Sequence, residues 1–588
     1  AAGVNAGNSI ASGGNYNVVI GDEAGTALTT GDKNTAVGFE ALKTEDANGG
    51  HTAIGYQSLK TLNAGSDSFN TAIGAGAGTA MTTGGNNVII GGVAGEALTD
   101  ADFNVVVGTV ALRTDTQGSK STAIGHGTLN AQNFSSATDS HNTAVGYQAG
   151  TAITTGVQNT LIGSTSGDAL TDADFNTLVG FGAAATDTKG NKTTALGYQA
   201  LGTQNFTSST DSHNTAVGYN AGVLLTTGIE NVLIGSLAGD ALTDADFNVA
   251  IGVESLGTDT KGNKTVAIGG GALNAQNFTS STDTHNVAVG FHAGNDVTTG
   301  IKNTMIGNLS GDKLTDADLN TAVGYGSLSE DIQGSRSTAI GAFALEAQAN
   351  SSATNADNVG IGVNAGAFIT TGTNNILIGV ASGASGTGNL QGNNSNIIIG
   401  NSGGQNCTNE RNIGIGQETN FVTHNDAIVI GYNVDSVGST HFTFGKDDGA
   451  NRVYNDYTNN ATFTRVSDER YKTDIQNNTD CGLDFINELR TVTFKWKALA
   501  DIDNTLPDYD ATQTKSHNPN KLYGMIAQEV KSALEKHNIT DFGGHSTVED
   551  SGIQAIAQSM FVYPLIKAVQ ELSAKNDALE ARIKTLEG

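Results

Sequence analysis

The stretch Asn142-Thr143-Ala144-Val145-Gly146 decides the fold of most of this chain, because close copies of it recur along about three quarters of the 588 residues. The usual step from one closing glycine to the next is that from Gly146 to Gly163, and longer steps, such as that from Gly125 to Gly146, interrupt the series. From Gly125 one longer step and three usual steps make a super-repeat, which begins again at Gly197, Gly269 and Gly341. The glycines stand at positions 21, 38, 55, 74, 91, 108, 125, 146, 163, 180, 197, 218, 235, 252, 269, 290, 307, 324, 341, 362, 379, 400, 416 and 431.

Self-similarity at a short, fixed period predicts a solenoid, in which each coil buries its apolar face by stacking on its neighbours. Within one coil, Thr143 to Val145 should form a short strand, and Gly146 permits a tight turn after it. Alternation places Ala144 on one face of this strand and its two neighbours on the other. Both faces are small or apolar. We therefore expect one face to line the interior of the coil and the other to meet sister chains around an axis.

The composition favours a repetitive β structure over an average globular core or a highly charged disordered chain. The chain has 78 glycines, 15% charged residues and 6% aromatic residues, which suits many tight turns. All three prolines (Pro507, Pro519 and Pro564) and the single tryptophan, Trp496, lie after residue 466. A chain of this length and uneven composition should form two or more units.

The net charge and the cysteines exclude several classes of function. A net charge of −29 argues against nucleic acid or an anionic membrane as the main partner. Cys407 and Cys481 lie on opposite sides of the change in composition and lack metal-ligand spacing, so a disulfide framework is not expected. No apolar run approaches the ~18 residues of a membrane helix. Because the sequence opens at Ala1 without Met, we expect a preceding region that attaches the chain to a larger particle.

Ser467-Asp468-Glu469-Arg470-Tyr471-Lys472 opens the part of the sequence that reads as an ordinary globular domain. Its hydroxyl and amine, five residues apart, could act as a nucleophile and its base. Serine attacks only when a neighbour takes its proton, and lysine can do so if burial or a positive neighbour lowers its pKa. Arg470 is such a positive neighbour. Taken alone, the motif is a weak signal and fits a polar turn at the start of a domain better.

Three further blocks follow this motif in order, at residues 482–495, 523–530 and 563–572. Together the four blocks resemble the intramolecular chaperone of phage tail fibres and tailspikes, the S74 family of self-cleaving peptidases, over about the last fifth of the chain. The resemblance implies a trimerising domain that nucleates folding of the fibre before it and then cuts itself off. It also implies that Ser467 is the nucleophile, that Lys472 is the base and that Ser467–Asp468 is the scissile bond. The activity would be a single-turnover cut of its own chain, with no other substrate expected.

The end of the chain carries a heptad pattern that predicts a coiled-coil helix from about residue 564. Val or Ile at one core position with Leu at the other favours dimers, whereas the chaperone resemblance implies a trimer. The two conflict, and we expect the trimer. The core positions are Leu565, Leu572, Leu579 and Leu586 on one side and Val569, Asn576 and Ile583 on the other.

The repeated phrases Asn-Thr-Ala-Val-Gly, Asn-Thr-Ala-Ile-Gly and Ser-Thr-Ala-Ile-Gly resemble the head repeats of trimeric autotransporter adhesins. That resemblance implies a trimeric, left-handed parallel β-roll, although the repeat of those adhesins is shorter than the one in this chain. They also end in a membrane-anchoring β-barrel, whereas this chain ends in a heptad helix. A bacterial surface adhesin is therefore an alternative function and not the preferred one.

The phrase Thr-Asp-Ala-Asp-Phe/Leu-Asn recurs once in each super-repeat and offers paired carboxylates. Stacked along a solenoid edge, such pairs could hold Ca²⁺, which takes six to eight oxygen ligands. We favour the alternative that no metal binds and that the Asp side chains bond the local backbone, with the Phe packed inward. The candidate calcium ligands are Asp100, Asp102, Asp172, Asp174, Asp244, Asp246, Asp316 and Asp318.

The longer steps contain extended loops, such as residues 130–141, that carry Phe134, Phe206 and Phe278 at equivalent positions. Stacked once in each super-repeat, these loops could form a row of knobs that contact a host glycan or protein. Equally, each Phe could pack on the adjacent coil. A tailspike that degrades glycans needs two carboxylates across a sugar cleft, and the Asp pairs recur identically instead of forming one distinct site. Glycan depolymerase is therefore only a second and less favoured alternative function.

The sequence as a whole predicts a mainly β, homotrimeric viral fibre without a cofactor. Residues 1–432 form a parallel β-solenoid shaft, residues 433–466 a collar with strands at 440–445 and 460–466, and residues 467–588 a small α+β chaperone domain. The expected function is bacteriophage host attachment through a cell-surface glycan or protein. The fibre would assemble in the host cytoplasm and act outside the cell as part of the virion.

Overall fold

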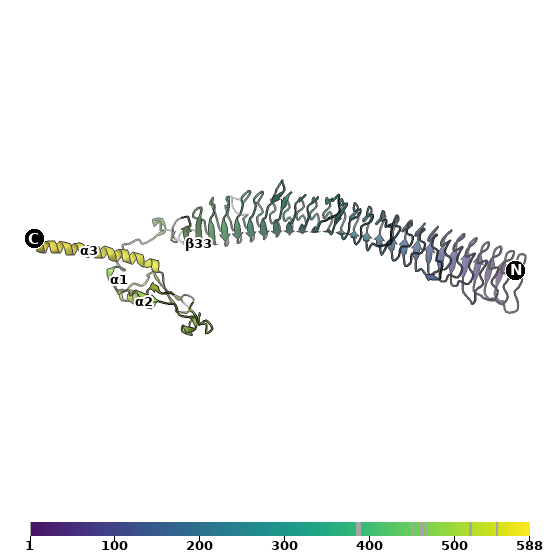
Figure 1. Cartoon of the computed structure of the whole chain (residues 1–588), viewed down its shortest axis with the longest axis horizontal. Coiled ribbons are helices and arrows are strands. Elements are labelled where there is room, and N and C mark those ends of the chain that lie inside the picture. Colours follow the sequence, from purple (N-terminus) through teal and green to yellow (C-terminus); the bar gives the residue numbers. More distant parts are fainter. Residues whose placement is uncertain are drawn as a thin grey trace. The chain divides into compact units, whose positions relative to one another are not determined.

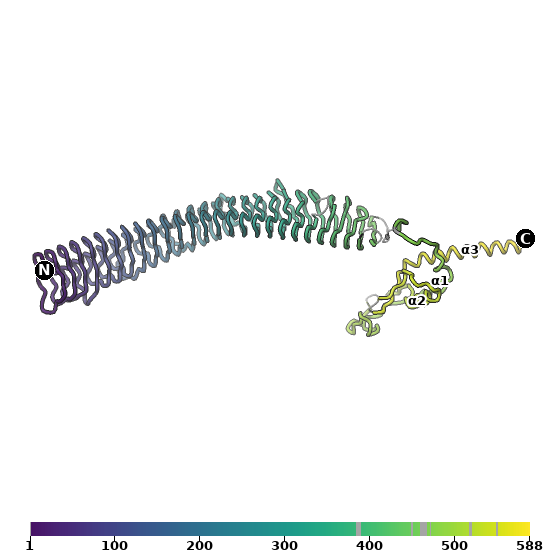
Figure 2. The backbone as a smooth tube through the Cα atoms, turned by 180° about the vertical axis from the view of Figure 1, so that it is seen from behind, coloured from purple at the N-terminus to yellow at the C-terminus, as the bar shows by residue number. Residues whose placement is uncertain are grey.

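The computed structural model describes residues 2–383, 390–447, 451–458, 464–465, 467–516, 520–548 and 551–588, with the backbone alone at 464, 465 and 471. The chain divides into two compact units, Ala1–Val466 and Ser467–Gly588. In the first unit, coil follows coil in sequence order, as the colour gradient in Figures 1 and 2 shows. Within the described residues, no helix is long and apolar enough to cross a membrane.

The first unit is a parallel β-solenoid, as the repeat predicted. Each repeat forms a short strand that pairs in parallel and in register with the strand of the next coil, for example Ala144 with Leu161. The strands are β1 (Val18–Ile20), β2 (Thr35–Val37), β3 (Thr52–Ile54), β4 (Thr71–Ile73), β5 (Val88–Ile90), β6 (Val105–Val107), β8 (Thr122–Ile124), β10 (Thr143–Val145), β11 (Thr160–Ile162), β12 (Thr177–Val179), β14 (Thr194–Leu196), β16 (Thr215–Val217), β17 (Val232–Ile234), β18 (Val249–Ile251), β20 (Val266–Ile268), β22 (Val287–Val289), β23 (Thr304–Ile306), β24 (Thr321–Val323), β26 (Thr338–Ile340), β28 (Val359–Ile361), β29 (Ile376–Ile378), β30 (Ile397–Ile399), β31 (Ile413–Ile415) and β32 (Ile428–Tyr432).

The longer coils add pairs of two-residue parallel strands on a second side of the solenoid. They are β7 (Gly118–Ser119) with β9 (Thr138–Asp139), β13 (Gly190–Asn191) with β15 (Thr210–Asp211), β19 (Gly262–Asn263) with β21 (Thr282–Asp283), and β25 (Gly334–Ser335) with β27 (Thr354–Asn355).

The expected collar contains β33 (His441–Lys446), which pairs in parallel with β32. The chain then reverses, because β34 (Arg452–Asp456) runs antiparallel to β33, and β35 (Thr464–Arg465) antiparallel to β34. The predicted strand at 440–445 is therefore present, one residue later. Of the predicted strand at 460–466, the structure describes only β35, and residues 459–463 and 466 lie outside the described residues.

The interior of the solenoid is lined by the central residue of each strand. Ala144, Leu161 and Leu178 are fully buried, whereas the residues on either side of them are partly exposed. The alternation seen in the sequence therefore does separate an interior face from an outward face. On the outward face, Val and Ile side chains are left exposed coil after coil in the single chain.

A ladder of buried asparagines runs beside the strands. The Oδ1 atom of Asn142 accepts a hydrogen bond from the backbone N–H of Asn159 at 2.9 Å. The Nδ2 atom of Asn142 donates to the carbonyl of Gly156 at 2.8 Å. Asn159 repeats both bonds toward Asn176 and Ala173. Each bond contributes about 1 kcal/mol net and satisfies backbone groups that burial would otherwise leave unpaired.

His51 takes one position of this ladder. Its Nδ1 accepts the backbone N–H of Asn70 at 3.3 Å, and its Nε2 lies 3.7 Å from Oε2 of Glu45. Both side chains are fully buried. Burial lowers the pKa of His51 to about 4 and raises the pKa of Glu45. The native coil therefore holds the neutral imidazole.

We predict that acid selectively loosens the coils around His51. An unfolded histidine binds a proton near pH 6.5, whereas the native ring stays neutral until about pH 4. The contribution of neutral His51 to the free energy of unfolding is complete above pH 6.5 and falls by about 3 kcal/mol as the pH drops to 4. Protonation of Glu45 over the same range offsets part of that loss. Hydrogen exchange of the amides of residues 52–70 measures the effect. His51→Asn, which restores the usual ladder residue, should reduce it, and equal acid sensitivity in both proteins would contradict this account.

The second unit is a small α+β domain. Two antiparallel pairs, β36 (Val492–Phe494) with β37 (Leu522–Gly524) and β38 (His545–Thr547) with β39 (Gln554–Ile556), accompany the helices. The helices are α1 (Leu483–Glu488), α2 (Ala527–Lys536) and α3 (Val562–Glu587), with short 3-10 helices η2 (Glu469–Tyr471), η3 (Leu499–Asp501) and η4 (Gln558–Phe561). Phe485, Val530 and Leu534 form the centre of its core. The N–H of Leu483 donates to Glu571 at 2.7 Å, which ties α1 to α3.

Candidate active site

The candidate site forms around a tight turn at the first residues of the second unit. Asp468 is the N-cap of η2, and its Oδ1 accepts the backbone N–H of Arg470 at 2.9 Å. The N–H of Lys472 donates to the carbonyl of Glu469 at 3.0 Å and ends the turn. Aspartate is a preferred N-cap residue because its side chain accepts an otherwise unpaired N–H. This turn folds the chain back, so that Lys472 approaches Ser467.

The turn brings the proposed nucleophile and base into contact. The Nζ atom of Lys472 donates to Oγ of Ser467 at 2.7 Å. This separation lies within the ~2.6–3.2 Å over which a base can take a proton from a nucleophile. Both side chains are exposed on the single chain. The structure therefore joins two of the residues that the sequence analysis selected, and it leaves them open to solvent.

Arg470, the positive neighbour that the sequence suggested, pairs with Asp468. Its Nε and Nη2 atoms donate to the two carboxylate oxygens of Asp468, at 3.0 and 2.6 Å. This pairing lowers the pKa of Asp468. The expected effect of Arg470 on Lys472 stays a prediction, and the structure adds a contact that positions Asp468. Arg470 holds the residue that follows the proposed scissile bond.

The recurring Asp pairs bond the protein itself. In each pair the second carboxylate accepts a backbone N–H from the preceding coil, at 2.7 Å for Asp102 and 2.8 Å for Asp174, Asp246 and Asp318. The first carboxylate faces lysine in two repeats, with Asp172 3.5 Å from Lys189 and Asp244 3.6 Å from Lys261. Across the described ranges, no group of three or more His, Cys, Asp or Glu side chains is placed to hold a metal. These bonds support the backbone interpretation over calcium.

One detail of that interpretation is wrong. The phenylalanines of the Asp pairs were expected to pack inward, but Phe103, Phe175 and Phe247 are 55%, 50% and 45% exposed. Asn104, the residue after Phe103, is buried in the asparagine ladder. Phe103 itself lies at a bend with a φ of +59°, and from this bend its side chain faces outward.

The phenylalanines of the longer loops are buried, in contrast to those of the Asp pairs. Phe134, Phe206 and Phe278 are only 6%, 5% and 7% exposed, so the expectation that their rings project toward a receptor is wrong. Each ring packs into the fold, as the alternative proposed. The exposed residues at the tip of the first loop are small and polar, including Ser135 and Ser136.

A buried carboxylate, which the sequence analysis missed, explains why these rings turn inward. The Oδ1 atom of Asp115 accepts hydrogen bonds from the backbone N–H groups of Gly118 and Phe134, at 3.0 and 3.1 Å. Its Oδ2 atom accepts a hydrogen bond from Nε2 of Gln132 at 2.6 Å. The Oε1 atom of Gln132 in turn accepts a hydrogen bond from Nδ2 of Asn142 at 2.9 Å. This buried aspartate could have been found from the sequence, because an equivalent aspartate recurs once in each super-repeat, at Asp187, Asp259 and Asp331.

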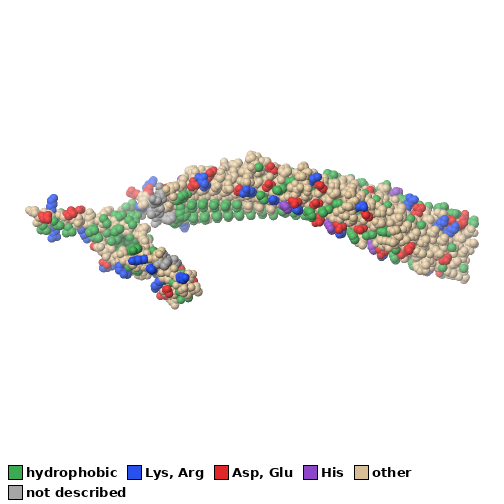
Figure 3. All heavy atoms as spheres, viewed as in Figure 1, with side chains coloured by type: hydrophobic (Ala, Val, Ile, Leu, Met, Phe, Trp, Pro, Cys, Tyr) green, Lys and Arg blue, Asp and Glu red, His purple; other side chains and the backbone are tan. Residues whose placement is uncertain are grey.

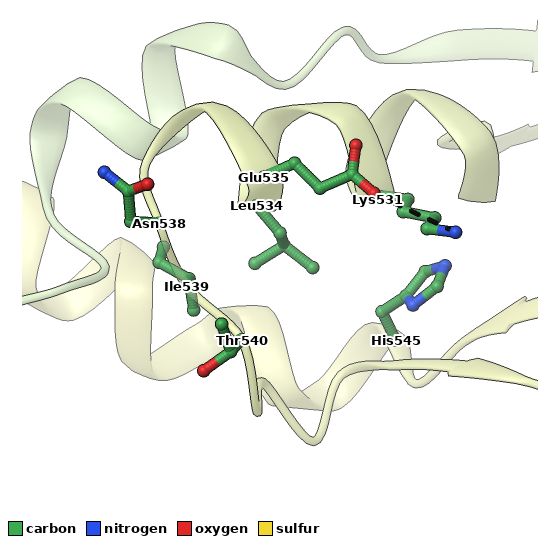
Figure 4. Close-up of a pocket in the computed structure, with 7 residues that line it drawn as sticks. All are labelled: Lys531, Leu534, Glu535, Asn538, Ile539, Thr540 and His545. Carbon is green, nitrogen blue, oxygen red and sulfur yellow. Dashed lines mark ion pairs between the residues drawn. The ribbon is translucent and has the colours of Figure 1, made fainter.

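A surface pocket of about 390 Å³ lies between α2 and β38. Figure 4 shows Lys531 and Glu535 on the helix, an ion pair at 3.9 Å, with the ring of His545 below them. His545 also contacts Oε1 of Gln554 through Nε2 at 3.1 Å. Neither Ser467 nor Lys472 lines this pocket, and its residues form no nucleophile–base pair.

Comparison with known proteins bears on the second unit. Residues 467–539 match the Peptidase S74 family model, described as the chaperone of endosialidase. The match begins at Ser467 and extends past the end of α2. No curated protein and no solved structure gives a significant match to the chain. The resemblance to the S74 chaperone is therefore confirmed for this segment, and the likeness of the shaft to autotransporter adhesins stays a prediction.

Proposed function

We propose that this protein is a homotrimeric viral tail fibre whose C-terminal unit assembles it and then cuts itself off between Ser467 and Asp468. One observation carries the proposal. A Ser–Lys pair in hydrogen-bond contact, at 2.7 Å, stands at the first residues of a segment similar to the chaperone of endosialidase. In the sequence, this segment follows a long parallel β-solenoid and its collar.

Exposed apolar side chains on the second unit support assembly with further copies. Along α3, both heptad core positions are exposed, as expected for a helix seam that awaits partners. Three identical seams could pack on one another without any other protein. The exposed apolar residues of α3 include Leu565, Val569, Leu572, Leu579, Ile583 and Leu586.

The outward face of the shaft supports the same assembly. Figure 3 shows hydrophobic side chains in continuous rows along one edge of the C-terminal half of the shaft. Burying such a row against sister chains would contribute about 25 cal/mol for each Å² of apolar surface removed from water. The exposed outward residues of the strands include Val88, Val105, Ile124, Ile162, Ile234, Ile306, Ile340, Ile376, Ile399, Ile415 and Ile430.

A C-terminal chaperone suits a fibre of this architecture for a kinetic reason. Long β assemblies nucleate slowly, because chains must meet in register before their contacts offset the lost entropy. A helix seam that joins the chains first converts this search into an intramolecular one. Removal of the chaperone would then make the assembled shaft hard to reverse.

The remaining parts of the proposal follow from the class of protein. A viral fibre carries its virion to a host surface glycan or protein and acts outside the cell. The strongly acidic chain suits neither nucleic acid nor an anionic membrane as partner. A tailspike that degrades glycans is the second candidate, and release of reducing ends from host polysaccharide would reveal it.

The dyad is tested by Ser467→Ala and Lys472→Ala in the full chain. Each variant should fold and assemble but stay uncut, because one lacks the nucleophile and the other lacks its base. Denaturing electrophoresis measures cutting, and native mass measures assembly. Ser532→Ala, which removes an exposed hydroxyl of α2, serves as the matched control and should be cut like wild type. An undiminished small fragment from Ser467→Ala would refute the assignment.

A further inference from the structure

We infer that the Ser467–Asp468 bond of one chain is cut by the Ser467–Lys472 pair of a second copy. The inference rests on the proposed function, in which this bond is cut and Ser467 is the nucleophile. It changes one expectation from the sequence, namely that each chain cuts itself. The substrate becomes the same bond in a sister chain.

Covalent geometry excludes attack by Ser467 on its own carbonyl carbon. The Oγ atom is joined to that carbon through Cβ and Cα, so the attack would close a four-membered ring of Oγ, Cβ, Cα and C. Bond angles near roughly 90° would replace the usual ~111°, a far larger distortion than protein bond angles tolerate. The short tether also prevents Oγ from approaching its own carbonyl carbon from above the carbonyl plane, as addition requires. The carbonyl that it attacks must belong to another residue.

The local geometry leaves the pair ready for a carbonyl from outside the chain. Lys472 and Ser467 are already in contact at 2.7 Å within one chain, and both are exposed. Nucleophile and base therefore need no second chain to meet. On the substrate side, Arg470 clamps Asp468 through both carboxylate oxygens, which fixes the residue whose nitrogen must leave. Each chain thus presents a complete attacking pair and an ordered bond to be cut.

The apolar seam of α3 explains how a second copy would stay close enough. Leu572, Leu579 and Ile583 are exposed on the single chain, and packing of copies through them would hold several Ser467 sites on one assembly. Linked sites of this kind meet at effective concentrations of about millimolar or more. A lone chain would lack both the partner bond and this proximity, so cutting would require assembly.

The reaction balances with one water molecule for each bond. The neutral amine of Lys472 takes the Oγ proton as Oγ bonds to the carbonyl carbon of residue 467 in the second copy. The C–N bond to Asp468 of that copy breaks, and the lysine returns the proton to the leaving nitrogen. An ester now joins the two chains. Water, deprotonated by the lysine, hydrolyses this ester to a carboxylate and restores the Ser467 hydroxyl.

Mixed assemblies test the inference. Wild-type chain and an N-terminally tagged Ser467→Ala chain are expressed together, and assemblies that contain both are isolated through the tag. The tagged chain should be cut immediately before Asp468, although it lacks a nucleophile, and the cut fraction should rise with the share of wild-type chain. Expressed alone, it should stay intact. Tagged Ser467→Gly repeats the test in case the first tagged variant assembles poorly.

Two outcomes would overturn the inference while leaving self-cleavage intact. One is that the wild-type chains of mixed assemblies are cut and their tagged companions are not. The other is cutting in a mixture of Ser467→Ala with Lys472→Ala, because neither chain of that mixture holds a complete pair. No cut in wild-type chain alone would instead overturn the proposed self-cleavage, and this inference with it.

Discussion

Gly91→Ala will open the solenoid at one coil, whereas Gly92→Ala, one residue away, will leave it closed. Gly91 has φ of +140°, and a Cβ added there would lie 2.6 Å from the carbonyl carbon of Gly108 in the next coil. The atoms that this Cβ would approach all belong to the backbone of Gly108 and Thr109, so no side chain can move aside to relieve the clash. At Gly92 an added Cβ would meet only the methyl carbon of Thr109, at an ordinary 3.9 Å. The expected cost at Gly91 is on the order of 4 kcal/mol, and at Gly92 it is close to zero.

The loss should be local, because a solenoid coil contacts only its neighbours. Hydrogen exchange of the amides in β5 and β6 will therefore show it more directly than a melting temperature. Gly91→Ala should remove most protection in these two strands and spare distant ones. Equal protection in Gly91→Ala and Gly92→Ala would mean that the close approach of successive glycines is not what holds the coils together.

Leu572→Lys combined with Leu579→Lys will prevent assembly. Both leucines are exposed core positions of the heptad on α3, and each loses about 1.5–3 kcal/mol of burial on replacement. Lysine would also place charge in the seam, where desolvation is costly. The double variant should therefore be monomeric by native mass, and its shaft should fold poorly because the chains no longer meet.

The matched control is Ala574→Lys with Ala581→Lys, which adds the same charges to the same helix at exposed positions outside the heptad core. This control should assemble and be cut like wild type. If the leucine variant also assembled and were cut, α3 would not be the element that brings the chains together. The proposed order of events, assembly before cutting, would then lose its physical basis.

The repeat allowed the solenoid to be predicted almost coil by coil, because each coil needs the same turn glycine and the same small inward residue. Ala144 and Gly146 carry that information locally. The direction of the phenylalanines could not be predicted, since it depends on contacts between coils. Phe134 is buried because Asp115, which lies in the preceding coil, binds its N–H, and Phe103 is exposed because its neighbour joins the ladder.

The candidate site was predictable for a different reason. Ser467 and Lys472 are brought together by one local turn, so their spacing in the sequence already determines that they can meet. The role of Arg470 was not predictable, because Asp468 can either cap the turn or leave the guanidinium unpaired, and only the folded geometry decides. Neither the repeat nor the local turn predicts how many chains assemble, because the heptad preferences and the chaperone resemblance point to different numbers.

The intact mass of freshly expressed wild-type protein, measured under denaturing conditions, tests the central claim most directly. The account predicts two species, one ending at residue 467 and the other beginning at Asp468. A single uncut chain that is nevertheless assembled by native mass would contradict self-cleavage, and it would make the C-terminal unit a permanent part of the fibre.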